Sequence, residues 1–345
     1  MAKNYRLVLA GFGNVGRAFA RLLMKKEGEL EEKYGVSFCV KGISTGSHGS
    51  AIDPVGLDLS KALELVESGQ SLDELNKVPH GANTIDFINA CAGDVLFETT
   101  SVNPVNGQPA IDHIIAGLEK GMHVVTANKG PVVHGYQKLT ELARSKNLNF
   151  MFESAVMDGA PIFSLFREPL MGARLLGFHG ILNSCTNLLL DLMAEGKTLE
   201  EAIQYGQSIG ITETDPSNDV DGWDASIKVA ALSTVLMDHP LTPQEVERTG
   251  IRGISPEMIR EAASVGEKWK LVCSAGYEQG EFKAGVAPQR VGADSPLYSV
   301  NGTSSFVVFK LDVLPGLGIL ESNPGPETTA FGLLADFLNI VKDIN

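Results

Sequence analysis

The sequence predicts an α/β protein in which a Rossmann-like nucleotide-binding domain is joined to a second, mixed α/β domain. Strand-like and helix-like segments alternate through the first half, a glycine-rich turn follows the first strand, and the pattern changes near residue 150. With 345 residues and 43% hydrophobic content, the chain is long enough for two domains. We expect residues 1–150 to form the nucleotide domain, with 325–345 returning to it. Residues 151–318 then form a substrate-binding and dimerisation domain.

The glycine-rich turn is the first candidate binding element. An apolar strand at 7–10 leads into the turn, and a helical pattern begins at Arg17. A G-x-G-x-x-G pattern indicates dinucleotide binding only between a strand and a helix, and that context is present. A turn that binds nothing is the alternative. The candidate cofactor-binding residues here are Gly11, Phe12, Gly13, Asn14, Val15 and Gly16.

Later strands of the first half bring polar residues to one edge of the predicted sheet. A strand at 94–98 ends before Thr100 and Ser101, and after a helix at 111–120 another strand begins at His123 and leads to Lys129. Ligands of open parallel sheets bind at the carboxyl ends of the strands. Thr100, Ser101 and Lys129 are therefore further cofactor-binding candidates.

The residues after the second strand, expected at 37–44, bear on the choice of cofactor. An acidic residue at this place holds the ribose 2′-hydroxyl of NAD. The segment Ser44-Thr-Gly-Ser-His48 contains neither a carboxylate nor an arginine. Without the acid nothing repels a 2′-phosphate, so the sequence slightly favours NADP, and use of both NADP and NAD stays open.

The second half begins with a strand at 149–153 and a turn punctuated by glycine and proline at 154–161. We then expect a strand at 177–182, a helix at 188–195 and a helix opened by the capping box Thr198-Leu-Glu-Glu201. A strand at 304–312 precedes only loop and a final helix. We therefore expect no appended regulatory domain.

An acidic segment carries the most specific chemistry of the second half. Five carboxylates lie between residues 213 and 224, and Lys228 follows Asp224 by four residues, which places both on one face of a helix. Such a site could hold an amino acid by its ammonium group and set a cation beside a reacting oxygen. In a simpler interpretation Asp221 caps a helix that begins near Gly222. A calcium loop starting at Ser217 is disfavoured, because Lys228 stands where a bidentate glutamate is needed.

Composition excludes several classes of function. The net charge of −14 and the pI near 5 argue against nucleic-acid binding. No apolar run is long enough to span a membrane, and the first strand begins too early for a signal peptide. Four widely spaced cysteines predict reduced thiols in a cytoplasmic protein.

Four motifs together resemble those of the homoserine dehydrogenase family. They are Gly11-x-Gly-x-x-Gly16, Val124-Val-Thr-Ala-Asn-Lys129, Gly180-x-Leu-Asn-x-x-x-Asn187, and the acidic segment from Gly210 to Lys228. The resemblance implies an NAD(P)-dependent, homodimeric oxidoreductase that interconverts L-homoserine and L-aspartate 4-semialdehyde.

The same resemblance implies roles for individual residues. Lys228 matches the catalytic lysine that exchanges a proton with the substrate, and Lys129 matches a second lysine near the nicotinamide. Glu213 and Asp224 match residues that bind the substrate's ammonium group, and Asp219 would organise that pocket. Gly325 would lie near the nicotinamide. A site for Na⁺ or K⁺ would consist of Glu153 with the carbonyls of Val156, Asp158 and Ala160.

Departures from the family pattern leave other functions open. Met157 and Asp158 stand in a turn that usually contains glycines, and Asn183-Ser-Cys-Thr186 replaces the more frequent Asn-Gly-Thr, so a related amino alcohol could be the substrate. The segment around Cys185 also resembles phosphorylating aldehyde dehydrogenases, in which a thiolate at a helix start attacks the aldehyde. A third hypothesis is an NAD(P)-sensing protein without turnover.

Overall fold

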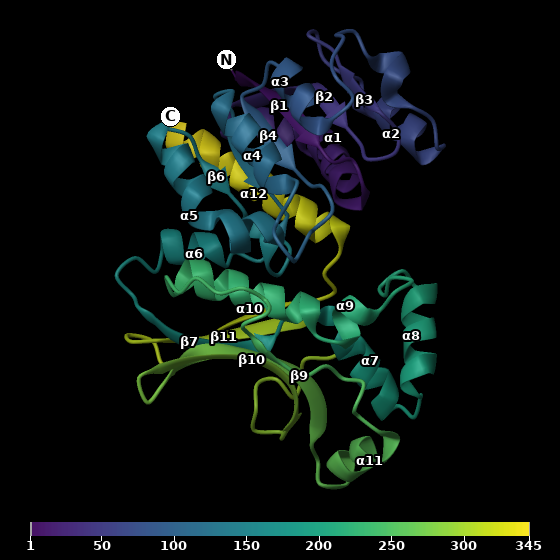
Figure 1. Cartoon of the computed structure of the whole chain (residues 1–345), viewed down its shortest axis with the longest axis vertical. Coiled ribbons are helices and arrows are strands. Elements are labelled where there is room, and N and C mark those ends of the chain that lie inside the picture. The colour runs from purple at the N-terminus through teal and green to yellow at the C-terminus, as the bar shows by residue number, and fades with distance from the viewer. Residues whose placement is uncertain (1, 345) are drawn as a thin grey trace. The chain divides into compact units, whose positions relative to one another are not determined.

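The computed structural model describes residues 2–344, the last of these by its backbone alone (Figure 1). The chain forms two compact units. One contains the residues up to Pro161 together with those from Gly325 onward, and the other spans Ile162–Pro324. Within residues 2–344, no helix combines the length and the apolar character that crossing a bilayer requires.

The first unit is built on a six-stranded sheet with the order β3-β2-β1-β4-β5-β6. All neighbouring strands are parallel except β3, which pairs antiparallel with β2. The chain turns to opposite sides of β1 to add β2 and β4, so the switch point at which such sheets bind ligands lies between β1 and β4. The Rossmann-like fold is therefore confirmed. The strands are β1 (Lys3–Ala10), β2 (Val36–Ser44), β3 (Ser50–Ile52), β4 (Val95–Glu98), β5 (His123–Thr126) and β6 (Phe150–Met151).

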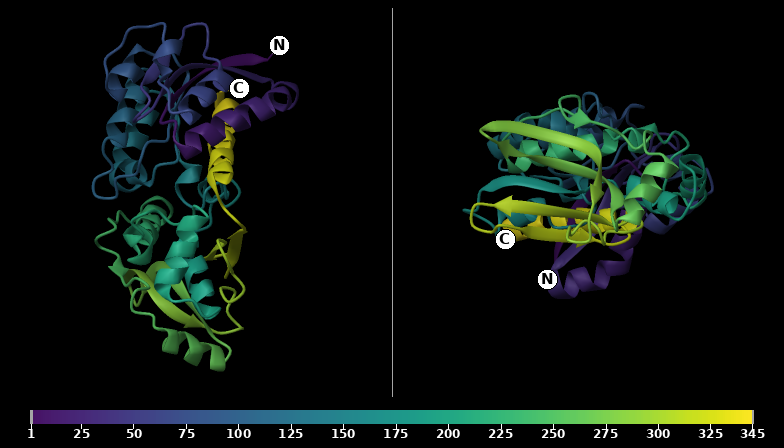
Figure 2. Two further views of the ribbon diagram at one scale, coloured as in Figure 1. Left: turned by 90° about the vertical axis from the view of Figure 1, so that its right-hand side faces the viewer. Right: turned by 90° about the horizontal axis from the view of Figure 1, so that it is seen from below.

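Helices cover this sheet, and the last of them comes from the C-terminal end of the chain. In Figure 2 the final helix lies beside the first, and its Phe337 is fully buried with its ring centre 5.5 Å from that of Tyr5. Apolar packing thus returns the C-terminal segment to the first unit. The helices are α1 (Asn14–Tyr34), α2 (Leu59–Glu67), α3 (Thr84–Ala90), α4 (Ala110–Glu119), α5 (Lys129–Ser145) and α12 (Pro326–Ile344), with short 3₁₀ turns η1 (Leu72–Leu75) and η2 (Glu153–Ala155).

The second unit contains a mixed six-stranded sheet with the order β12-β11-β7-β9-β10-β8. Its strands are β7 (Leu175–Ile181), β8 (Glu247–Arg248), β9 (Lys268–Glu278), β10 (Glu281–Val291), β11 (Ser305–Leu311) and β12 (Leu317–Glu321). The helix α10 (Trp223–Leu236) crosses one face of this sheet (Figure 1), because its run from Val229 to Leu232 is apolar and almost completely buried. The other helices are α6 (Phe163–Arg167), α7 (Ser184–Ala194), α8 (Leu199–Ser208), α9 (Ser217–Val220) and α11 (Pro256–Ser264).

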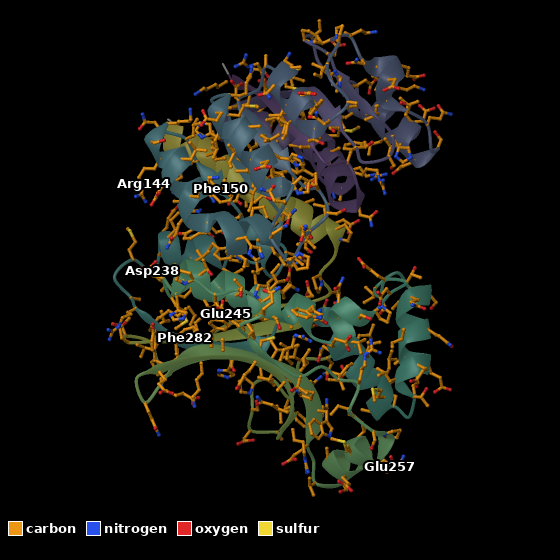
Figure 3. All side chains as sticks on the ribbon, in the orientation of Figure 1. Arg144, Phe150, Asp238, Glu245, Glu257 and Phe282 are labelled. Atoms are coloured by element: carbon orange, nitrogen blue, oxygen red, sulfur yellow. The ribbon has the colours of Figure 1, made fainter. Side chains whose placement is uncertain are left out.

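The side chains follow the expected division between interior and surface. In Figure 3, Phe150 lies inside the first unit, whereas Glu257 projects from α11 in the second. Phe150 is 8% exposed, and the side chain of Glu257 is 68% exposed. Buried apolar side chains therefore stabilise both units, and the polar site residues are attached to the helices, strands and loops of these units.

Three sequence expectations need correction. Residues 151–161 belong to the first unit, because Ser154 donates a hydrogen bond to the carbonyl of Thr329 on α12 at 2.8 Å. The strand at 149–153 shortens to β6, and Glu153 instead begins η2. A further strand, β12, follows the strand at 304–312, where only loop and helix were expected.

Candidate active site

Gly11, Gly13 and Gly16 of the first turn are each glycine for a different structural reason. A Cβ on Gly11 would lie 2.5 Å from the carbonyl carbon of Thr99, and a Cβ on Gly16 would lie 2.5 Å from the oxygen of Gly11. Gly11 also adopts a φ of +104°, which favours glycine. A Cβ on Gly13 would meet no atom within 4 Å, so the start of α1 is open to a ligand. The N-terminus of this 21-residue helix carries no side-chain cap, which suits the binding of a phosphate anion.

A buried carboxylate that the sequence analysis missed connects the loops after β4 and β5. Glu98 is 0% exposed, and it accepts hydrogen bonds from the backbone N–H of Thr100 at 2.9 Å and from the hydroxyl of Thr126 at 2.8 Å. The Thr100 hydroxyl donates to the same carboxylate. The sequence feature that could have identified Glu98 is an acidic residue at the end of an apolar strand. Glu98 thereby fixes the loop that carries Thr100 and Ser101.

Asn128 extends this network to Lys129. Its side chain caps α5 by accepting from Gly130 N–H at 3.0 Å and donates to the carbonyl of Thr100 at 3.2 Å. Lys129 is the first residue of α5 and is half-buried. The structure therefore brings Thr100, Ser101 and Lys129 to the carboxyl edge of adjacent strands. Gly325 lies just before α12 in the same unit, where its carbonyl accepts from Thr328 at 2.7 Å.

In the second unit, the lysine and the carboxylates of the acidic segment meet as their spacing predicts. Lys228 Nζ lies 2.9 Å from Asp224 Oδ2, and it donates a hydrogen bond to the carbonyl of Leu182 at 2.7 Å. The two side chains are only 16% and 23% exposed. Partial withdrawal from water strengthens this charge pair, because the local dielectric is lower than that of bulk water.

Asn183 connects Asp224 to Asp219. Its Nδ2 donates to Asp219 Oδ1 at 2.6 Å and to Asp224 Oδ2 at 3.0 Å. Burial, and then the neighbouring charge of Asp224, raise the pKa of the Asp219 carboxyl. Lys228, Asp224, Asp219 and Asn183 thus form one cluster, which we call the carboxylate–lysine cluster.

Other parts of the acidic segment differ from the expectations. Glu213 lies on an exposed loop, and among residues 2–344 no hydrogen bond joins its side chain to the carboxylate–lysine cluster. Asp221 does not cap α10: the cap position is Gly222 at a φ of +80°, and the Asp221 carboxylate pairs with Arg252. The calcium-loop alternative also fails, because Ser217–Val220 is helical.

Cys185 is placed near the start of α7, but its surroundings do not favour the thiolate that an activated nucleophile requires. The residue is 5% exposed, and its sulfur shares a hydrogen bond with the Thr212 hydroxyl at 3.2 Å. Burial, reinforced by the charge of Asp219, raises the pKa of this thiol to about 12. A reactive cysteine needs a lowered pKa. The burial and the raised pKa therefore disfavour the aldehyde dehydrogenase alternative for this residue.

The turn expected to hold a monovalent cation lies wholly in the first unit. Glu153 and Val156 are buried, and the backbone N–H of Glu153 donates to Asp336 Oδ2 at 2.7 Å. Met157 and Asp158 adopt φ values of +54° and +47°, so two non-glycine residues take the conformation that glycines favour. The hydroxyl of Thr329 donates to Asp158 Oδ1 at 2.9 Å, which orients that side chain toward α12. The fourth expected ligand, Ala160, is also buried.

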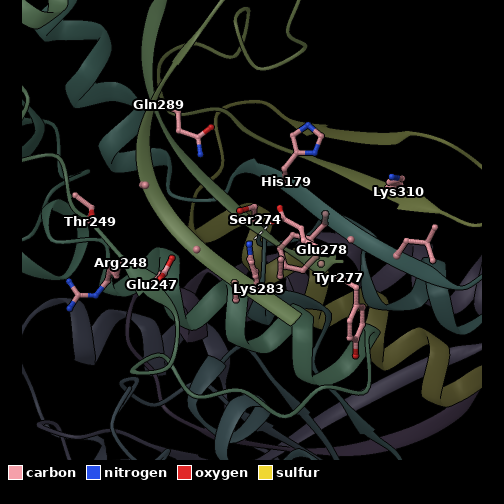
Figure 4. Close-up of a pocket in the computed structure, with 18 residues that line it drawn as sticks. His179, Glu247, Arg248, Thr249, Ser274, Tyr277, Glu278, Lys283, Gln289 and Lys310 are labelled. Atoms are coloured by element: carbon pink, nitrogen blue, oxygen red, sulfur yellow. Dashed lines mark hydrogen bonds and ion pairs between the residues drawn. The ribbon is translucent and has the colours of Figure 1, made fainter. Parts of the chain in front are cut away.

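An open trough of about 800 Å³ lies on the second sheet (Figure 4). Its walls include His179, Tyr277, Lys283 and Lys310 from four neighbouring strands. None of the candidate catalytic or substrate-binding residues lines it. The trough therefore plays no part in the site derived from the sequence.

Comparisons with known proteins identify the family. Residues 11–153 match the family model "Homoserine dehydrogenase, NAD binding domain", and residues 161–338 match the model "Homoserine dehydrogenase". The chain belongs to the homoserine dehydrogenase family. It therefore contains an NAD(P)-binding domain and is an oxidoreductase of the type that acts on CH–OH groups.

Individual homoserine dehydrogenases are similar over almost the whole chain. An NAD(+)-dependent homoserine dehydrogenase of Pseudomonas canavaninivorans is 34% identical, and the match covers 97% of this chain and 96% of the relative. The enzyme of Methanocaldococcus jannaschii is 35% identical over 97% of this chain and 98% of its own. A hyperthermophilic archaeal homoserine dehydrogenase, solved in complex with NADPH, has a TM-score of 0.84 at 29% identity, covering 99% of this chain and 98% of that one.

Proposed function

We propose that this protein interconverts L-homoserine and L-aspartate 4-semialdehyde by NAD(P)-dependent hydride transfer, with Lys228 exchanging a proton with the substrate oxygen. The observation that carries the proposal is the half-buried contact between Lys228 and Asp224, beside Asp219. Carboxylates suit the substrate's ammonium group, and a lysine suits an oxygen whose charge changes during reaction. A related amino alcohol is the alternative substrate.

Each residue would contribute one part of the reaction. As the neutral amine, Lys228 would take the hydroxyl proton when homoserine is oxidised, and as the resulting ammonium it would return that proton to the substrate oxygen in the reverse direction. Lys129 would stand near the nicotinamide and polarise the same oxygen. Asp224, Asp219 and Glu213 would hold the ammonium group, and for Glu213 this requires the exposed loop to bring its side chain to the cluster. The bound cofactor would accept or supply the hydride.

The cofactor would bind over the open helix start at Gly13, with Gly11, Phe12, Asn14, Val15 and Gly16 forming the turn and Thr100, Ser101, Lys129 and Gly325 lining the nicotinamide side. We propose a slight preference for NADP. It rests on the lack of an acid in Ser44–His48, where the Thr45 hydroxyl closes the loop by donating to Gly49 O at 3.0 Å. Related enzymes are consistent with either cofactor, since one is named NAD(+)-dependent and another was solved with NADPH.

We also propose a Na⁺ or K⁺ site formed by Glu153 and the carbonyls of Val156, Asp158 and Ala160. The position of these residues in one buried turn of the first unit supports it, since Glu153, Val156 and Ala160 are all less than 10% exposed. Replacing KCl and NaCl by choline chloride at constant ionic strength tests the site. Activity that does not depend on either cation would refute it.

A homodimer located in the cytoplasm completes the proposal. The face of the second sheet that α10 does not cover supports dimerisation, because it exposes apolar side chains such as Leu320, which is 58% exposed. The four free cysteines are consistent with a reducing compartment. Light scattering of the purified protein at several concentrations would detect the dimer, and a monomeric mass throughout would contradict it.

The decisive experiment follows NAD(P)H formation by purified protein over homoserine and neighbouring amino alcohols, with each cofactor in turn. We expect the highest kcat/KM with L-homoserine. Activity with another amino alcohol and none with homoserine would leave the proposed mechanism in place and change the proposed substrate. Cofactor binding without turnover of any member would favour the sensing function and refute the proposal.

A further inference from the structure

Asn183 lies between two carboxylates of the cluster, and its side chain has two separate functions. Its oxygen caps α7 by accepting from Thr186 N–H at 2.8 Å. Its nitrogen donates one hydrogen bond to Asp219 at 2.6 Å and another to Asp224 at 3.0 Å. Capping alone would need only the oxygen, so the amide nitrogen requires a separate explanation.

The two carboxylates would otherwise repel each other. Both lie near one nitrogen atom in a site that is largely withdrawn from water, where like charges disfavour ionisation. The groups facing Asp219 are Asp224, Lys228 and the Cys185 thiol. The buried Cys273 thiol, on β9, lies near Lys228 and Asp224. Lys228 supplies a positive charge to Asp224, whereas the amide of Asn183 serves both acids.

We propose that Asn183 is a positioning residue whose amide group keeps Asp219 and Asp224 together as an ionised pair, ready to receive the substrate's ammonium group. The proposal rests on the proposed function, because it assigns that ammonium group to the same two acids. Asn183 itself does not exchange a proton or bind the hydride. Its position at the end of β7 and the start of α7 fixes the amide, since its oxygen is already used as the helix cap.

The substitution Asn183→Ser separates the two functions. Serine is an equally good helix cap, but its hydroxyl cannot donate to two carboxylates. We expect kcat/KM for homoserine to fall about 10- to 100-fold, the size expected for lost hydrogen bonds to charged groups. The acidic limb of the kcat/KM profile should move up by about one pH unit, because the acids ionise less readily without the amide.

Asn83→Ser is the matched control. Asn83 caps α3 with its oxygen and donates to Asp86 with its nitrogen at 2.8 Å, but it is an exposed residue outside the site. This variant should keep the wild-type pH profile. NAD(P)H binding, followed by its fluorescence, and the melting temperature of each variant report whether the fold is retained.

Three results would overturn the inference. An unshifted acidic limb in Asn183→Ser would show that the amide does not control ionisation, even if activity falls. A shift of the acidic limb by the same amount in Asn83→Ser would show that the effect is not specific to Asn183. Failure of both Asn183→Ser and Asn183→Thr to fold would assign Asn183 a structural role instead. Absence of homoserine turnover in the wild type would refute the proposed function. The inference about Asn183 fails instead when the wild type is active and the variants behave as described above.

Discussion

Replacing Lys228 by alanine tests the proton-transfer step. The substitution removes the ammonium group that lies 2.9 Å from Asp224 and 2.7 Å from the carbonyl of Leu182, while leaving both acceptors in place. Loss of one preorganised charge-stabilising donor reduces kcat about 10²- to 10³-fold, or about 3–4 kcal/mol. The KM for the cofactor should stay within about twofold, since Lys228 belongs to the second unit and the glycine turn to the first.

Initial rates of NAD(P)H formation at saturating homoserine measure the effect. Lys33→Ala is a suitable control, because Lys33 also pairs with an acid four residues away, Glu29, but its side chain is 67% exposed. An exposed pair contributes about 0–1 kcal/mol to stability, and this variant should retain wild-type kcat. If Lys228→Ala keeps more than half of the wild-type kcat, the proposed role of Lys228 is wrong.

Three further predictions concern Cys185, Glu98 and the cofactor. Cys185→Ser should keep at least about half of the wild-type kcat, since a buried thiol with a raised pKa takes no part in the reaction; complete inactivation would restore the covalent mechanism. Glu98→Gln should raise the cofactor KM about tenfold, because the carboxylate fixes the Thr100 loop; an unchanged KM would argue against that role. The KM for NADP should be lower than that for NAD, and a strong preference for NAD would contradict our interpretation of residues 44–48.

Local patterns in the sequence were enough to predict the elements that carry the site. The strand–glycine–helix pattern placed the turn around Gly13, and the spacing of Asp224 and Lys228 placed them on one face of α10. The capping box at Thr198 and Glu201 is also confirmed. These features depend on interactions within a few residues, which composition and periodicity record directly.

Features that depend on distant contacts could not be predicted in this way. Asp221 has the right residue type for a helix cap, but Arg252, which is remote in the sequence, takes its carboxylate. The roles of Glu98 and Asn183 depend on which strands and loops become neighbours. Burial decides the chemistry of Cys185, because the sequence alone reports its position at a helix start and not its raised pKa.

Deuterium transfer from labelled substrate tests the central claim most directly. L-Homoserine carrying two deuterium atoms on C4 is incubated with the protein and the oxidised cofactor, and both products are analysed by mass spectrometry. We predict one deuterium in the reduced cofactor and one in the semialdehyde, with both products formed about 10²- to 10³-fold more slowly by Lys228→Ala. Reduced cofactor without deuterium, or no reduced cofactor at all, would contradict hydride transfer from homoserine at this site.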